Sequence, residues 1–217
     1  MVDSVDVLAI DTASPAPAVA LLSGGEIVEA RLSPDRKASE ELLPALRSCL
    51  ERAGGIPLER LFRLAVCAGP GSFTGMRVGL ATVWGLSRAA GVPLEAVSTL
   101  EAMAEAWRGE GTVSVWTALD AGRGEAVFQR FALTEDRARA ESEPSRAPIE
   151  AALRAMRGTA AVALPRDLLS PDGPALPRSP ARALALAVAR APRLLREALP
   201  APIYARSSAA EEKHGAA

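Results

Sequence analysis

The stretch CAGPGSFTGMRVG, residues 67–79, decides how the first half of the chain folds. It follows an apolar run, 64–68, that is typical of a buried strand, and it leads into a helical pattern over 74–90 that Gly91 and Pro93 close. A glycine-rich turn between a strand and a helix can bind an anion through the free N–H groups of the helix N-terminus. It can also carry chemistry or contact another protein, and the surrounding sequence has to decide between these roles.

Three familiar glycine-rich motifs do not fit this stretch. A Walker A loop needs a lysine before Ser or Thr, and no lysine lies nearby. The dinucleotide fingerprint G-x-G-x-x-G fails because Thr74 stands at the third glycine position, and the hydrolase elbow G-x-S-x-G would put Phe73 at the nucleophile position. An anion site at the helix N-terminus and a plain turn capped by Ser72 or Thr74 both remain open.

The helix after the turn carries an unusual set of glycines. Gly79 and Gly85 lie in its interior and Gly75 near its start, and each interior glycine costs about 1 kcal/mol relative to alanine. Gly75 and Gly79 share one helical face, four residues apart, so a neighbour can approach the backbone closely there. That neighbour is either this protein's own sheet or a second polypeptide.

The first half of the chain predicts a β-meander followed by alternating helices and strands. Ser39 is the expected N-cap of the first helix, and Pro44 predicts a kink or a later start near Leu43. Ser98 and Glu101 have the spacing of a capping box. The predicted strands are 5–11, 18–22, 26–32, with a Gly24-Gly25 hairpin between the last two, then 64–68 and 94–97, and the predicted helices are 39–53, 74–90 and one that follows Ser98.

The second half opens in the same way and then becomes irregular. It predicts a hairpin of 112–119 with 125–133, a charged linker over 134–148, a helix over 149–156, a short strand over 160–164, a proline-rich stretch over 164–180 without regular structure, and a helix over 181–198 that Pro192 interrupts. Arg137 and its neighbouring arginines alternate with acids and are expected on a solvated surface. We therefore predict two lobes, 1–104 and 105–217, of which the second is a degenerate copy with a polar tail.

Composition limits the possible functions. The chain has 217 residues, 49% of them hydrophobic, which suffices for one large core or two small ones, and its net charge of −1 gives no general attraction to nucleic acid. No apolar run approaches the ~20 residues that span a bilayer, so we expect a cytoplasmic protein with no membrane contact. Cys49 and Cys67 are expected in the core. The single histidine, His214, lies in the polar tail, which excludes histidine-dependent catalysis and most zinc sites.

Five segments together resemble the TsaB (YeaZ) family of bacterial tRNA threonylcarbamoyladenosine biosynthesis proteins in order and spacing. They are IDTASPAPAVALL (10–22), SEELLP (39–44), AGPGSFTGMRVGLATVWGLSRAAGVPLEAVSTLEAMA (68–104), ALDAGRGEAVF (118–128) and PIYAR (202–206). The resemblance is dense over 7–104 and 119–128 and thin over 134–200. It implies an actin-like ATPase (RNase H-like) fold with two related lobes, each a mixed sheet flanked by helices.

The resemblance also implies a non-catalytic role. TsaB-like proteins associate with TsaD, the related subunit that transfers a threonylcarbamoyl group to the adenosine beside the anticodon, in tRNAs that read codons starting with A. The ATPase TsaE joins them, tRNA is held mainly by the catalytic partner, and TsaB-like chains also form homodimers through the same helix pair, here 39–53 and 74–90. On this basis the expected partner-binding residues are Leu43, Arg47, Thr74, Gly75, Arg77, Val78, Gly79 and Ala81.

Two departures from the catalytic pattern support that role. The resemblance implies metal-binding histidines on the first helix of the catalytic relative, whereas DRKASEELLPAL (35–46) contains none and Ala38 stands where TsaB chains often have histidine. The phosphate motif of the superfamily corresponds to 11–12, but Ala13 and the residues after it replace its usual glycine. We expect no catalytic residue, metal or cofactor, and we expect Asp11 and Asp120 to cap turns. An ATP-dependent transferase, a glycoprotease-like enzyme and a small-molecule or anion sensor at the glycine-rich turn are the alternatives.

Overall fold

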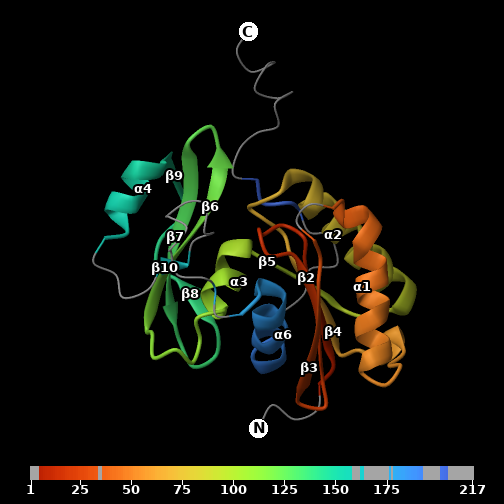
Figure 1. Ribbon diagram of the computed structural model, residues 1–217. Coiled ribbons are helices and arrows are strands. Elements are labelled where there is room, and N and C mark those ends of the chain that lie inside the picture. The colour runs from red at the N-terminus through yellow and green to blue at the C-terminus, as the bar shows by residue number, and fades with distance from the viewer. Residues whose placement is uncertain are drawn as a thin grey trace.

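The computed structural model describes residues 5–33, 36–157, 162–163, 176, 178–192 and 201–204. They form a mixed α/β fold with two sheets that stand side by side, each flanked by helices (Figure 1). Helices α3 (Thr99–Glu105) and α6 (Pro180–Arg190) pack against each other in the layer between the sheets. The predicted mixed sheets with flanking helices are therefore confirmed.

The first sheet has five strands in the order β3-β2-β1-β4-β5. The strands are β1 (Val7–Asp11), β2 (Ala18–Ser23), β3 (Glu26–Arg31), β4 (Arg63–Cys67) and β5 (Leu94–Val97). The first three form the predicted antiparallel meander, and β4 and β5 run parallel to β1. Gly24 and Gly25 have φ values of +57° and +83°, the left-handed conformation that a tight hairpin requires and that glycine adopts readily.

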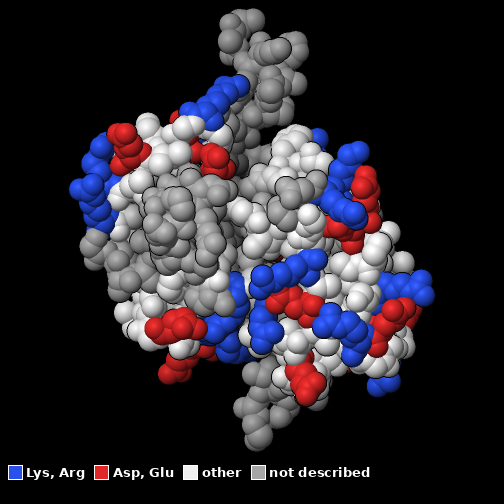
Figure 2. Space-filling model, viewed as in Figure 1, with Lys and Arg blue, Asp and Glu red and all other residues white. Residues whose placement is uncertain are grey.

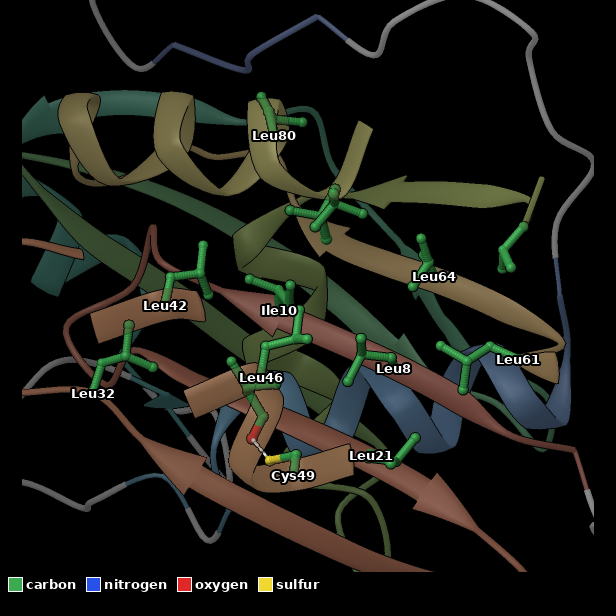
Figure 3. Close-up of a cluster of buried hydrophobic side chains, with 14 of the residues drawn as sticks. Leu8, Ile10, Leu21, Leu32, Leu42, Leu46, Cys49, Leu61, Leu64 and Leu80 are labelled. Atoms are coloured by element: carbon green, nitrogen blue, oxygen red, sulfur yellow. Dashed lines mark hydrogen bonds between the residues drawn. The ribbon is translucent and has the colours of Figure 1, made fainter. Parts of the chain in front are cut away.

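One face of this sheet is covered by α1 (Ala38–Arg52) and α2 (Phe73–Ala90), with the short 3-10 turn η1 (Leu58–Arg60) beside them. Figure 3 shows the leucine-rich core between these helices and the sheet. Lys37, not Ser39, is the N-cap of α1, and no side chain caps it, so the predicted Ser39 cap is wrong. The helix also continues through Pro44, which contradicts a later start. Burial of Leu42 and Leu46, at about 1.5–3 kcal/mol each, offsets the roughly 3 kcal/mol that an interior proline costs.

The opposite face of the first sheet is covered by α6, which comes from the second half of the chain. Leu184, Ala185 and Val188 pack there against apolar side chains of β1 and β4. Helix α3 contacts α6 and three strands of the second sheet. The lobe limits 1–104 and 105–217 stay a prediction, and the packing of α6 means that the two parts of the chain share one buried layer.

The second sheet is built on a long hairpin. Its strands are β6 (Ser114–Gly122), β7 (Glu125–Leu133), β8 (Ala138–Ala140), β9 (Ser145–Pro148) and β10 (Val162–Ala163), and α4 (Ile149–Ala155) packs on β7 and β9. The hairpin and α4 confirm their predictions. The charged linker predicted over 134–148 is wrong, because β8 and β9 both pair with β7. Most of the proline-rich stretch, residues 193–200 and residues 205–217 lie outside the described residues, and α6 ends at Arg190.

Candidate functional site

The glycine-rich turn is tied to the end of β1. The backbone N–H of Ser72 donates to the carbonyl of Ala13 (2.8 Å), and the Ser72 hydroxyl accepts from the N–H of Gly75 (3.2 Å). Ser72 is therefore the N-cap of α2, as one of the two interpretations of this turn predicted. Two N–H groups that an anion at this helix end would use are already bound within the protein, which weakens the anion-sensor alternative.

The two glycines near the start of α2 face inward. A Cβ on Gly75 would lie 1.8 Å from the carbonyl oxygen of Thr12, and one on Gly79 would lie 2.4 Å from the Thr12 hydroxyl. That hydroxyl donates to the carbonyl of Gly75 (2.7 Å), so α2 and the end of β1 are in direct backbone contact. The expectation that Gly75 and Gly79 belong to a partner-binding surface is corrected: the close neighbour is this protein's own chain.

Asp11, at the end of β1, closes a turn of its own. It is fully buried, and its Oδ1 accepts from the N–H groups of Ala13 (2.9 Å) and Ser14 (3.0 Å), while its Oδ2 accepts from the Ser14 hydroxyl. Burial raises the pKa of Asp11 above its ordinary value, and these hydrogen bonds oppose the rise. Asp120 forms a similar but exposed turn by accepting from the N–H of Gly122 (2.6 Å). Both carboxylates thus cap turns, as predicted.

The two cysteines are buried and unpaired with each other. Burial raises the pKa of the Cys67 thiol well above its ordinary value, and the neighbouring carboxylate of Asp11 raises it further. Burial also raises the pKa of Cys49. Both thiols are therefore core groups of low nucleophilicity, as expected.

The exposed surface of α1 and α2 contains most of the other predicted partner-binding residues. Leu43 is 56% exposed, and Arg47, also exposed, pairs with Glu51 (2.7 Å). Thr74, Arg77 and Ala81 are exposed on α2, whereas Val78 is half-buried. The two helices pack side by side, so these exposed residues belong to neighbouring helices.

The outer face of α2 has a regular pattern that the sequence prediction missed. Exposed residues recur every fourth position and become small toward the C-terminal end: Phe73, Arg77, Ala81, Gly85 and Ala89. A Cβ on Gly85 would meet nothing within 4 Å. We call these five residues the α2 stripe, and its small members allow another backbone to approach from outside.

A second segment from the far end of the chain completes this region. Residues 201–204, which we call the C-terminal strap, lie against the glycine-rich turn: the N–H of Ile203 donates to the carbonyl of Ala68 (2.7 Å), and a Cβ on Gly69 would lie 2.3 Å from the Ile203 carbonyl oxygen. The ring of Tyr204 lies 5.3 Å from that of Phe73. The segment PIYAR was the sequence signal for this contact, but nothing in its composition indicated where it binds.

A buried ionic cluster joins the two sheets. Arg137, just before β8, donates to the carboxylates of Glu95 on β5 and Glu101 on α3 (3.1 Å), and to the carbonyl of Ala191 after α6 (3.2 Å). Arg137 is only 6% exposed, so its expected place on a solvated surface is wrong. The Ser98 side chain makes no cap hydrogen bond and the Glu101 carboxylate is bound by Arg137, so the predicted capping box is wrong.

A cavity of about 300 Å³ lies beside this cluster. Its walls come from the second sheet, from α3 and the loops that follow β4 and β5, and from the strap, and they include Glu101, Gln129, Phe131, Ile203 and Tyr204. Within the described residues no group of three or more His, Cys, Asp or Glu side chains is placed to hold a metal ion. No helix in that same part of the chain combines the length and apolar character needed to cross a bilayer.

Comparison with known proteins relates this geometry to a family. A family model described as TsaD, tRNA N6-adenosine threonylcarbamoyltransferase, matches residues 32–160, which is more than half of the chain. The chain is 39% identical over 132 residues to the tRNA threonylcarbamoyladenosine biosynthesis protein TsaB of Escherichia coli (strain K12), covering 60% of this chain and 56% of that protein. It is 36% identical over 124 residues to the TsaB of Haemophilus influenzae, covering 57% of this chain and 52% of that protein. The chain belongs to the TsaB/YeaZ family.

A solved structure supports the TsaB/YeaZ assignment over a longer part of the chain. YeaZ from Pseudomonas aeruginosa superposes with a TM-score of 0.69 at 28% identity, covering 85% of this chain and 90% of that one. The chain spans little more than half the length of the two curated TsaB proteins. Two of the segments that carried the TsaB resemblance contact each other in the structure: Ile203, from the segment PIYAR, lies against Ala68 and Gly69 of the glycine-rich stretch.

Proposed function

We propose that this chain is a non-catalytic partner subunit in the biosynthesis of tRNA threonylcarbamoyladenosine. In this proposal the outer faces of α1 and α2 dock on a TsaD-type transferase, which carries out the reaction. The observation that carries the proposal is the exposed surface itself: Leu43 is exposed on α1, which packs against α2, and the exposed residues Ala81 and Gly85 on α2 leave room for another subunit to come close. A few leucine-sized contacts at about 1.5–3 kcal/mol each suffice for an interface of moderate affinity.

The strand order and the actin-like assignment belong to the same proposal. A three-stranded antiparallel meander extended by two parallel strands, with helices on both faces, is the arrangement expected of an actin-like lobe. The second sheet, also opened by a hairpin, would be its reduced counterpart. The names of the TsaB relatives and of the matched family model support the pathway, and a cytoplasmic location follows from a role in tRNA modification.

The interior offers little to an enzyme. Asp11 stands at the phosphate motif of the superfamily, and its carboxylate accepts hydrogen bonds from the N–H groups of its own turn. The Thr12 hydroxyl donates to the carbonyl of Gly75. Both carboxylate oxygens of Asp11 already accept hydrogen bonds from the turn, so a metal ion would have to displace these contacts. Turnover of ATP or peptide by the purified chain, lost in an Asp11→Ala variant that remains folded, would contradict the proposal.

The other partners follow from the docking surface. A homodimer through α1 and α2 would compete with the TsaD-type subunit, and a TsaE-type ATPase would join the assembled pair. Figure 2 shows basic and acidic residues interspersed over the viewed face, and the net charge is −1, so we assign the tRNA mainly to the catalytic subunit.

The test is assembly with the TsaD-type subunit of the same organism, measured by size-exclusion chromatography and calorimetry. Leu43→Glu places an unpaired charge in the proposed interface and should abolish complex formation. Val113→Glu is the matched control, because Val113 is 79% exposed but lies on the chain leading into β6, away from α1 and α2. Equal binding by both variants, or equal loss, would refute the proposed surface.

A further inference from the structure

Exposed apolar side chains gather where α2 meets the C-terminal strap. Among the described residues six large apolar side chains are exposed, and three of them, Phe73, Ile203 and Tyr204, lie at this junction. Single exposed apolar residues are normal on a protein surface, whereas clusters of them usually mark a contact site.

Arg77 is held between the two rings of this cluster. Its guanidinium carbon lies 3.8 Å from the centroid of the Phe73 ring and 5.9 Å from that of Tyr204, and its Nε donates to the Tyr204 hydroxyl (3.2 Å). These contacts fix the orientation of the guanidinium and bind only one of its five N–H donors. Because Arg77 contacts Phe73 on the helix and Tyr204 on the strap, its position depends on the strap.

The positive side chain at this junction is Arg77. Arg77 forms no ion pair with any carboxylate of the described residues, whereas Arg47 on α1 pairs with Glu51. The first turn of α2 contains no acidic residue, so the partial positive charge of the helix N-terminus adds to that of Arg77. The junction is therefore complementary to a carboxylate, which an arginine can bind through two parallel hydrogen bonds.

We propose that Phe73, Arg77, Ile203 and Tyr204 form a docking site for a protein that places a carboxylate against Arg77 and an apolar side chain against the rings. The inference rests on the proposed function, because the occupant is the same TsaD-type subunit. Tyr204 acts in it as a positioning residue for Arg77. Tyrosine and arginine are the residues that most often dominate the binding energy of protein interfaces.

Single-stranded RNA is the competing occupant, since bases also stack on aromatic rings beside arginine. RNA binding normally draws on several phosphate contacts along a basic groove. This junction offers one arginine on a chain of net charge −1, with acidic residues interspersed among the basic ones (Figure 2). The observations therefore favour a protein.

The experiment measures the affinity of full-length variants for the TsaD-type subunit at low and high salt. We expect Arg77→Gln to weaken binding about 30-fold and to flatten its salt dependence, Tyr204→Ala about 10-fold and Tyr204→Phe about 3-fold. The matched control is Arg154→Gln, because Arg154 is exposed on α4, which packs on the second sheet, whereas α1 and α2 cover the first. It should stay within about 2-fold of the wild type.

The possible results separate this inference from the proposed function. If Arg77→Gln and Tyr204→Ala bind normally while Leu43→Glu does not, the docking site is wrong and the proposed function stands. If the wild-type chain does not bind the subunit, the docking site and the proposed function are both wrong. Equal losses for Arg77→Gln and Arg154→Gln, or a loss confined to labelled tRNA binding, would also overturn the docking site. If Tyr204→Ala lowers the melting temperature, the affinities of Tyr204→Phe and Arg77→Gln are the measurements that test the docking site.

Discussion

Two glycines of the same helix, Gly75 and Gly85, should respond in opposite ways to the same substitution. In Gly75→Ala the new methyl group would lie 1.8 Å from the Thr12 carbonyl oxygen and 3.0 Å from the Ser72 hydroxyl, so α2 has to move away from β1. Overpacking of this kind costs about 3 kcal/mol, and the threatened Ser72 cap and Thr12 hydrogen bond add about 1 kcal/mol each. The gain in helix propensity returns about 1 kcal/mol.

We therefore expect Gly75→Ala to lower the free energy of unfolding by about 4 kcal/mol. Gly85→Ala, where the methyl group meets nothing within 4 Å, should raise it by about 0.5–1 kcal/mol. Urea denaturation followed by circular dichroism measures both values, and an unchanged dependence on urea would show that the denatured state is not affected.

A third substitution tests the direction of the contact. At Gly79 the obstacle is the Thr12 hydroxyl, 2.4 Å from the new Cβ, which Thr12→Ala removes. For the double variant, the loss in the free energy of unfolding should be at least 1 kcal/mol smaller than the sum of the losses caused by Gly79→Ala and Thr12→Ala alone. If Gly75→Ala is as stable as the wild type and loses only the partner, the glycines face outward and the reasoning is refuted.

Three further predictions concern buried groups. The folded-state pKa of Asp11 lies above its ordinary value of 3.8, so its ionisation opposes folding and the free energy of unfolding falls as the pH rises from about 4 through the folded-state pKa. Asp11→Asn keeps the hydrogen-bond acceptor of the turn and should remove this pH-dependent loss in urea titrations at several pH values. Asp11→Ala should lower the free energy of unfolding by about 2–4 kcal/mol at every pH. An Asp11→Asn variant less stable than the wild type would contradict this. Arg137→Ala should destabilise the chain by about 3–5 kcal/mol in the same assay, because the buried carboxylates of Glu95 and Glu101 both lose the arginine that binds them. A loss below about 1 kcal/mol would show that solvent replaces the arginine. Cys49 and Cys67 should resist a thiol reagent until the chain unfolds, and rapid labelling of the native protein would show that they are accessible.

Local signals in the sequence predicted the parts of the fold that depend on short-range physics. The Gly24-Gly25 hairpin, the Ser72 cap and the strand-turn-helix around the glycine-rich stretch all follow from neighbouring residues. The sequence could also have predicted that Gly75 faces the core, because Met76 and Leu80, each one position after a glycine, are apolar and buried. Helical phase then puts both glycines on the core side.

Contacts between residues far apart in the sequence could not be predicted in the same way. Glu101 has the spacing of a capping box, but Arg137, 36 residues away, takes its carboxylate instead. The strands β8 and β9, which pair with β7, have only three and four residues, too few for a period-two pattern to be recognised in the sequence. The strap reaches the glycine-rich turn from the end of the chain, and only a fold can bring the two together.

The buried polar groups and the exposed apolar groups lead to one conclusion about where function lies. Asp11, Thr12, Glu101 and Arg137 are all engaged in contacts that hold the fold. Of the six large apolar side chains that are exposed among the described residues, Leu43 lies on α1 and Phe73, Ile203 and Tyr204 lie on the α2 stripe and the strap. Substitutions of buried residues such as Gly75 will therefore reduce partner binding only by unfolding the chain. Surface substitutions such as Leu43→Glu and Arg77→Gln are the ones that can separate binding from stability.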